Sequence, residues 1–177
     1  MITVSDIFNF LNSRCPIDTA CDFDNVGILV GDETKEVKSI VVALDCDKTA
    51  VDKAISVGAD LIVTHHPVIF EPLKAVREGD IVYRLISNNI SVISMHTNLD
   101  VAESGVSDTL CRVLELSDIE PFVAEDGFCI RKAKTNIKSA HDLALHINPN
   151  SAAECDTPKA MQIFPMCLSV QVRAEIF

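Results

Sequence analysis

Residues 60–67 read DLIVTHHP, and residues 90–100 read ISVISMHTNLD. In both stretches an apolar run typical of a buried strand leads directly into polar residues, and helix-like sequence lies between them. In a parallel α/β sheet, such strand exits face the crevice in which ligands bind. The imidazoles and the carboxylate at these exits are common ligands of divalent metal ions. The two stretches therefore predict a metal site at one edge of a parallel sheet.

The wider pattern predicts an α/β fold with three layers, in which a mainly parallel sheet is flanked by helices. A first helix, capped by Thr3 or Ser5, ends before Pro16. Residues 39–44 form a continuous apolar strand, as expected where both sheet faces are covered. Sequential strands usually lie close together, so we expect the two polar clusters to meet. The other predicted elements are strands at 26–30, 60–63 and 90–95, helices at 48–57 (capped by Gly58), 79–88, 104–114 and 140–147, and a hairpin over 122–134 with its turn at Asp126-Gly127.

Length and composition set limits on the kind of protein. The 177 residues are 48% hydrophobic, which predicts a globular domain with a substantial core. The net charge of -11 argues against a nucleic-acid backbone or an anionic membrane surface as the main partner and leaves a small-molecule substrate. Scattered cysteines, no basic leader and no apolar run near ~20 residues predict a soluble cytoplasmic protein. Motifs of P-loop kinases, common dinucleotide-binding folds and serine hydrolases do not occur in the sequence.

The histidine pair is the strongest local signal for chemistry. A strand exit relaxes the alternation of side chains, and Pro67 restricts His66 to an extended conformation. His65 and His66 can then direct two nitrogen donors into one pocket, including one to each of two metal ions. Asp100 can ligate and bridge two ions, while His96 either ligates directly or orients a bound water or substrate oxygen. The structural alternative is that these histidines only form hydrogen bonds with the backbone.

Other polar residues near strand ends, together with the remaining histidines, have a weaker case, and we favour a structural role for each. They are Asp22, Asp24 and Asn25 in an acidic turn, Asp45 and Asp47 at a strand exit from which they can support the site, Cys46 as a packed thiol, and His141 and His146, whose i, i+5 spacing does not suit shared ligation.

Four stretches occur in order along the chain: DNVGILVG at 24–31, ALD at 43–45, GADLIVTHHPVIF at 58–70 and HTNLD at 96–100. Together they resemble the Nif-three-like dinuclear metal-centre family, whose bacterial members carry the label type-two GTP cyclohydrolase I homologue. The resemblance covers residues 1–150, with Phe23 where the family usually has tryptophan, and leaves residues 151–177 as an atypical tail. It implies a homohexameric ring of α/β subunits. It also implies two divalent ions (zinc, iron or manganese) per subunit in the complete family site, with His65, His66 and Asp100 as metal ligands.

The chain departs from this family at its C-terminal end. Family members complete the site with a histidine and a glutamate four residues later, whereas His141 is followed at that distance by Leu145, and His146 by Asn150. The chain therefore resembles a member that is incomplete at its C-terminus. With these ligands missing, we expect at most about one tightly bound ion per chain.

The resemblance implies a dinuclear metal-binding, hydrolase-like protein, a GTP cyclohydrolase type-two homologue that uses a metal-activated water on a small molecule such as a nucleotide. The missing ligands favour an alternative, a non-catalytic metal-binding or partner-binding protein. Metal-dependent product formation from GTP distinguishes the two.

Overall fold

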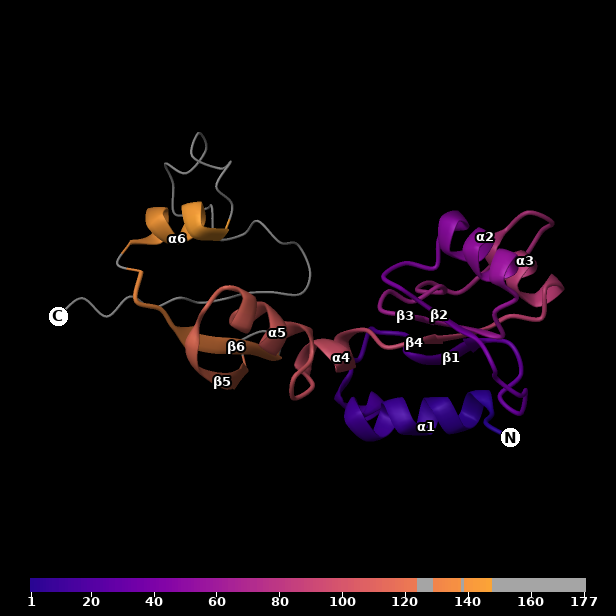
Figure 1. Ribbon diagram of the computed structural model, residues 1–177, viewed down its shortest axis with the longest axis horizontal. Helices are drawn as coiled ribbons and strands as arrows, with labels where there is room; N and C mark the ends of the chain where they lie inside the picture. Colours follow the sequence, from indigo (N-terminus) through magenta and orange to yellow (C-terminus); the bar gives the residue numbers. More distant parts are fainter. Residues whose placement is uncertain (124–128, 138, 148–177) are drawn as a thin grey trace. The chain divides into compact units, whose positions relative to one another are not determined.

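The computed structural model describes residues 1–123, 129–137 and 139–147, and the chain divides after Ala102 into two compact units (Figure 1). The first unit contains a four-stranded sheet in the order β1-β4-β3-β2. Strands β2, β3 and β4 are parallel, and β1 runs antiparallel to β4. The predicted α/β fold with a mainly parallel sheet is therefore confirmed. The strands are β1 (Gly27–Val30), β2 (Ile40–Ala43), β3 (Leu61–Thr64) and β4 (Ser91–Ser94).

Helices cover both faces of this sheet. Figure 1 shows α1 (Val4–Arg14) on one side, with α2 (Lys48–Val57) and α3 (Ile81–Ser87) on the other. The Thr3 side chain caps α1 by accepting a hydrogen bond from the Asp6 N–H, and Asp47 caps α2 in the same way. Gly58 ends α2 in the left-handed region, with φ of 64°. Each N-terminal cap of this kind contributes about 1 kcal/mol.

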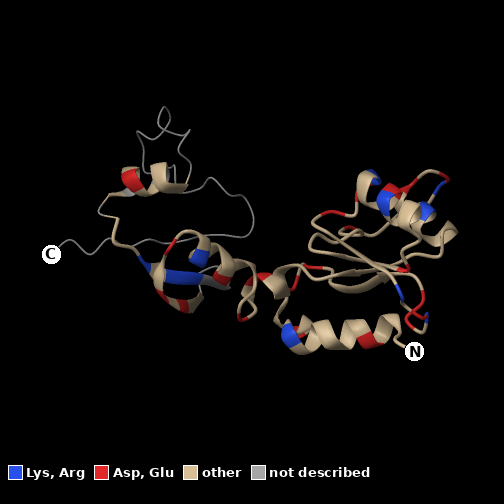
Figure 2. Ribbon diagram, viewed as in Figure 1, with Lys and Arg blue, Asp and Glu red and all other residues tan. Residues whose placement is uncertain are grey.

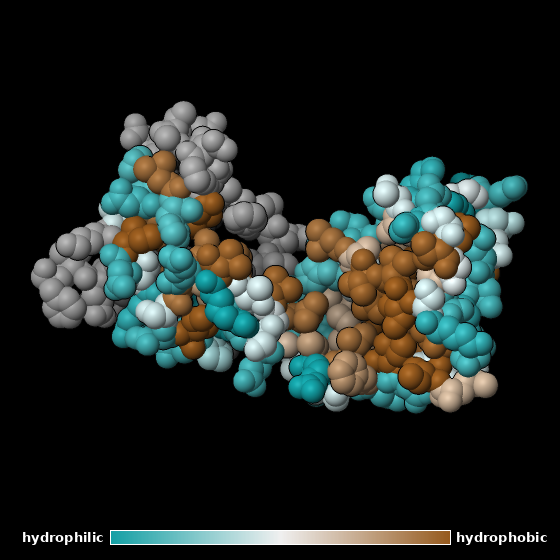
Figure 3. Space-filling view, in the orientation of Figure 1, coloured by the Kyte–Doolittle hydropathy of each residue, from teal (hydrophilic) through white to brown (hydrophobic). Residues whose placement is uncertain are grey.

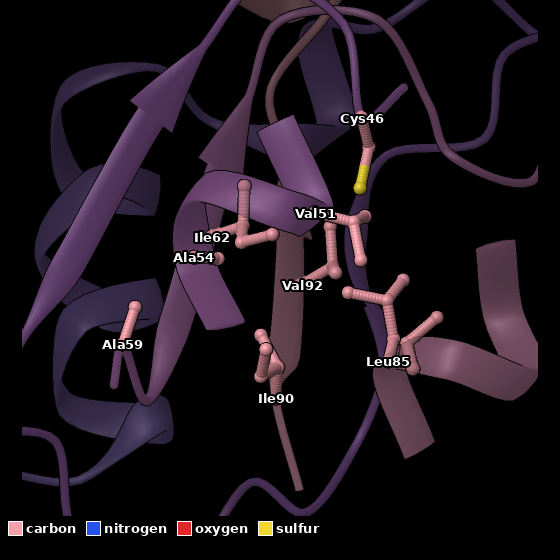
Figure 4. Packing of buried hydrophobic residues seen from close by; sticks show 9 residues of the cluster. Cys46, Val51, Ala54, Ala59, Ile62, Leu85, Ile90 and Val92 are labelled. Atoms are coloured by element: carbon pink, nitrogen blue, oxygen red, sulfur yellow. The ribbon is translucent and has the colours of Figure 1, made fainter. Parts of the chain in front are cut away.

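The core of the first unit consists of two apolar clusters, one on each face of its sheet. Successive side chains of a strand point to opposite faces, so neighbouring residues of β3 and β4 enter different clusters. Figure 4 shows Ile62 and Val92 packed with Val51 of α2 and Leu85 of α3. Leu61 and Ile93 belong instead to the cluster with α1. Full burial of one such side chain contributes about 1.5–3 kcal/mol.

The interpretation of residues 39–44 as a strand covered on both faces is wrong. β2 is the edge strand of the sheet in the first unit, and Val41 alone of its large side chains packs against a core cluster. Ile40 and Val42, on the opposite face, are 43% and 78% exposed. Figure 3 shows a broad apolar area on the visible face of this unit. An apolar run indicates burial, but the position of a strand in the sheet decides how much burial it receives.

The second unit, from Glu103 onward, contains α5 (Val106–Val113), β5 (Ser117–Val123), β6 (Cys129–Lys134) and α6 (Ala140–Ile147). β5 and β6 form an antiparallel pair, as predicted for the hairpin, and its expected turn lies outside the described residues. Asp108 of α5 forms an ion pair with the buried Arg131 of β6. The atypical tail, 151–177, also lies outside the described residues.

Within the described ranges, no helix is both long and apolar enough to cross a membrane. Figure 2 shows lysine and arginine spread over both units and interspersed with acidic residues.

Candidate metal centre

The parallel pairing of β3 and β4 brings the two predicted clusters together. Thr64 lies opposite Ser94, so the residues that follow each strand leave the sheet at the same edge. The Thr64 and Ser94 hydroxyls are 2.9 Å apart and form a buried hydrogen bond. The Thr64 hydroxyl also donates to the His66 carbonyl at 2.9 Å. These contacts fix the start of the histidine segment on the rigid end of the sheet.

Three imidazole rings gather at this edge. The ring centroids of His65 and His66 are 5.0 Å apart, those of His65 and His96 are 5.1 Å apart, and those of His66 and His96 are 5.6 Å apart. One nitrogen from each ring lies within 4.8 Å of the other two. His65 and His96 are largely buried, whereas the His66 side chain is 44% exposed. A single cation can therefore reach all three rings from the His66 side.

Each of the three rings is oriented through its Nδ1 atom. The Nδ1 of His65 is 3.0 Å from the Met95 carbonyl, that of His66 is 2.6 Å from Asp45, and that of His96 is 2.9 Å from Asp24. Carbonyl and carboxylate oxygens only accept hydrogen bonds, so each Nδ1 carries the proton and donates it. Each Nε2 is then left with its lone pair. This is the arrangement that orients histidine ligands in metal sites.

Asp100 places a buried carboxylate beside one of these rings, that of His65. It lies on α4 (Thr97–Val101), a short helix that the sequence pattern did not predict. Asp100 is 5% exposed, and its Oδ1 has no hydrogen-bond partner among the described residues. That oxygen is 3.5 Å from the Nε2 of His65. A buried carboxylate oxygen without a partner is costly, and a cation beside it removes that cost.

The surroundings of His65 favour its uncharged form, which can bind a metal ion. Burial lowers the pKa of His65 below its ordinary value, although Asp100 and the Met95 carbonyl oppose this effect. The ring is therefore neutral at pH 7, the form in which histidine binds metal ions. Three imidazoles and one carboxylate form a nitrogen-oxygen donor set that suits zinc, iron or manganese.

Asp24 has a larger role than the acidic turn proposed from the sequence. Its side chain is fully buried and accepts hydrogen bonds from His96 and from the backbone and hydroxyl of Thr97. Burial by itself raises the pKa of Asp24, but the bonds from Thr97, His96 and Asn25 outweigh it and hold the pKa below its usual range. The signal that could have identified Asp24 is topological. β1 is antiparallel to β4, so residues just before β1 lie at the exit of β4.

The remaining predicted residues divide between the cluster and the structural framework. Asp45 contacts His66, as its strand-exit position allowed, whereas Asp47 caps α2. Cys46 packs in a core cluster, as expected, and burial, with Asp47 nearby, raises the pKa of its thiol to about 11. Asp22 is exposed in the turn before Asp24. His141 and His146 are exposed on α6 in the second unit.

Comparisons with known proteins identify relatives of this chain. A family model described as Duf34/NIF3 (NGG1p interacting factor 3) matches residues 2–169. A Clostridium acetobutylicum protein named GTP cyclohydrolase 1 type 2 homolog is 37% identical over 136 residues, covering 75% of this chain and 50% of the relative. The crystal structure of Staphylococcus aureus protein SA1388 has a TM-score of 0.66 at 37% identity, covering 70% of this chain and 36% of that one. A Bacillus cereus protein related to NIF3 has a TM-score of 0.64 at 37% identity, covering 67% and 34%.

The chain spans about half the length of this curated relative and about a third of the two solved chains. The family match nevertheless extends over most of the chain and includes all four ordered motifs. The chain belongs to the Duf34/NIF3 family.

Proposed function

We propose that this chain binds a divalent metal ion through His65, His66, His96 and Asp100. The observation that carries the proposal is the unpartnered buried Oδ1 of Asp100 beside three imidazoles whose Nδ1 atoms are already engaged. Those bonds leave the Nε2 atoms of the three clustered histidines and the Asp100 oxygen beside His65, which together equal the four donors of a tetrahedral zinc site. Asp24 and Asp45 orient His96 and His66 by accepting hydrogen bonds from their Nδ1 atoms.

We further propose that the intact site belongs to a metal-dependent hydrolase that acts on a nucleotide. The name of the Clostridium acetobutylicum relative, GTP cyclohydrolase 1 type 2 homolog, supports this substrate class. A divalent ion held at the cluster would lower the pKa of a bound water and make it a nucleophile near neutral pH. His96, held by Asp24, is placed to ligate or to orient the reacting groups. The homohexamer that the family resemblance implies is part of the same proposal, whereas a second metal ion would need donors beyond the four residues named here.

A metal-binding protein without turnover is a second candidate, and the donor count favours it. The four donors among the described residues complete a shell for one ion and leave none for a second. Closed four-ligand sites are typical of structural metals, whereas catalytic sites keep an open position. Metal-dependent formation of product from GTP by the full chain distinguishes a hydrolase from this alternative.

Metal analysis after dialysis tests the site itself. We expect about one retained ion per wild-type chain, of the zinc, iron or manganese type, because four donors suit one ion. Asp100→Asn keeps the side-chain volume but removes the charge, and His66→Ala removes a donor, so both should lose most of the metal. His141→Ala changes an exposed histidine on α6 and is the matched control. Two retained ions per chain, or unchanged metal in Asp100→Asn and His66→Ala, would contradict the proposed site.

A further inference from the structure

Two aromatic side chains lie beside the histidine cluster and reach solvent. The Phe70 ring meets His96 edge to face, with centroids 6.4 Å apart and planes at 90°. Phe23 meets Phe70 in a similar way, with centroids 6.5 Å apart. Phe70 is 42% exposed and Phe23 is 57% exposed. Phe23 and Phe70 are not among the proposed metal ligands, and an exposed aromatic pair is a frequent feature of binding surfaces.

The framework that orients His96 also holds the aromatic pair in place. The Asn25 side-chain amide donates to the Ile69 carbonyl at 2.6 Å, which joins the turn that carries Phe23 to the segment that carries Phe70. Asp24, in the same turn, accepts from the Nδ1 of His96. The aromatic pair and the metal-binding residues therefore share one hydrogen-bonded framework.

The geometry suits a flat ligand. In an edge-to-face pair the rings do not stack on each other, and the 42% exposed Phe70 ring keeps surface that a planar group can cover. A nucleobase can cover such a surface, and stacking on an aromatic side chain tolerates any base because every base has a π-face. The phosphate of the same molecule could then approach the cation at the exposed His66 side of the cluster.

We propose that Phe70 and Phe23 form the base-binding wall of a nucleotide site next to the histidine cluster. The inference rests on the proposed function and specifies how its substrate is recognised. Phe70, which contacts His96, is the main stacking residue, and Phe23 extends the wall away from the cluster. The aromatic pair then selects ligands that carry a planar base, whereas the metal-binding residues interact only with the phosphate of the ligand.

Titration calorimetry on the zinc-loaded full chain tests this wall with two probes that differ only in the base, guanosine 5′-monophosphate and ribose 5′-phosphate. We expect wild type to bind the nucleotide about tenfold more tightly than the sugar phosphate. Phe70→Leu and Phe23→Leu keep apolar bulk but remove the π-face, and each should reduce this preference to about threefold or less. Phe10→Leu alters another exposed phenylalanine, on α1, and should keep the full preference.

Metal content, measured on every variant, separates the two proposals. Unchanged zinc together with a lost base preference in Phe70→Leu supports the base-binding wall. Equal affinity of wild type for both probes, no measurable binding of either, or a full preference in Phe70→Leu overturns it and leaves the metal site intact. A chain that retains no zinc refutes the metal proposal instead, and a base preference that depends on Phe70 would still support the wall.

Discussion

Replacing Asp24 by asparagine should destabilise the protein and weaken its metal site together. Both carboxylate oxygens of Asp24 act as acceptors. Oδ1 accepts from His96 Nδ1 at 2.9 Å and from the Asn25 N–H at 2.8 Å, while Oδ2 accepts from the Thr97 N–H at 3.0 Å and from its hydroxyl. An asparagine must place an NH₂ group at one of these positions. At either position this NH₂ group would face a backbone N–H, that of Asn25 or that of Thr97, and two donors cannot form a hydrogen bond with each other.

The expected magnitude follows from the bonds lost. A hydrogen bond to a charged group contributes about 1.5–3 kcal/mol, and leaving a buried donor unsatisfied costs about 1–3 kcal/mol. We therefore expect Asp24→Asn to lower the free energy of unfolding by about 2–4 kcal/mol. The loss of the partner that orients His96 should also reduce metal affinity by about 10- to 100-fold.

Urea unfolding in the presence of a chelator measures the first effect, and zinc titration measures the second. Asp22→Asn is the control, because it makes the same change at an exposed position in the same turn. If Asp24→Asn stays within about 0.5 kcal/mol of Asp22→Asn and binds zinc equally well, the buried hydrogen-bond network does not support the site as inferred.

Two further predictions concern the framework of the first unit. Gly31→Ala should lower the free energy of unfolding, measured with urea, by about 1–3 kcal/mol, because the added Cβ would lie 2.7 Å from the Ser91 Cα. Gly79→Ala is the control, since Gly79 has a similar positive φ but nothing within 4 Å of the added Cβ, and it should cost less. Equal losses in the two variants would contradict this steric explanation. Hydrogen bonds from the backbone of Lys38 and Ser39 lower the pKa of Asp60, so its contribution is present above the unfolded pKa of about 3.9 and lost as pH falls through the folded pKa. The free energy of unfolding should therefore fall more steeply below about pH 4 in wild type than in Asp60→Asn, and parallel pH profiles would argue against this contribution.

Local sequence patterns were sufficient for most of the elements of the first unit. The helix at 48–57 begins after the Asp47 cap and ends at Gly58, because both boundaries depend on residues within the helix and next to it. The apolar runs before His65 and His96 form strands β3 and β4, as predicted. α4 was not predicted, since its five residues are too few to show a helical period.

The sequence by itself determined that His65, His66, His96 and Asp100 would gather. They follow two consecutive strands joined by a helix, and that order favours parallel neighbours whose carboxyl ends share one edge. Only the tertiary structure decided which residues orient them. Asp24 lies 72 residues from His96, and it reaches that ring because β1 pairs antiparallel with β4. This pairing joins strands that are distant in the sequence, so no local sequence pattern predicts it. The exposure of Val42 has the same origin, because the place of β2 at the edge of the sheet is a property of the whole topology.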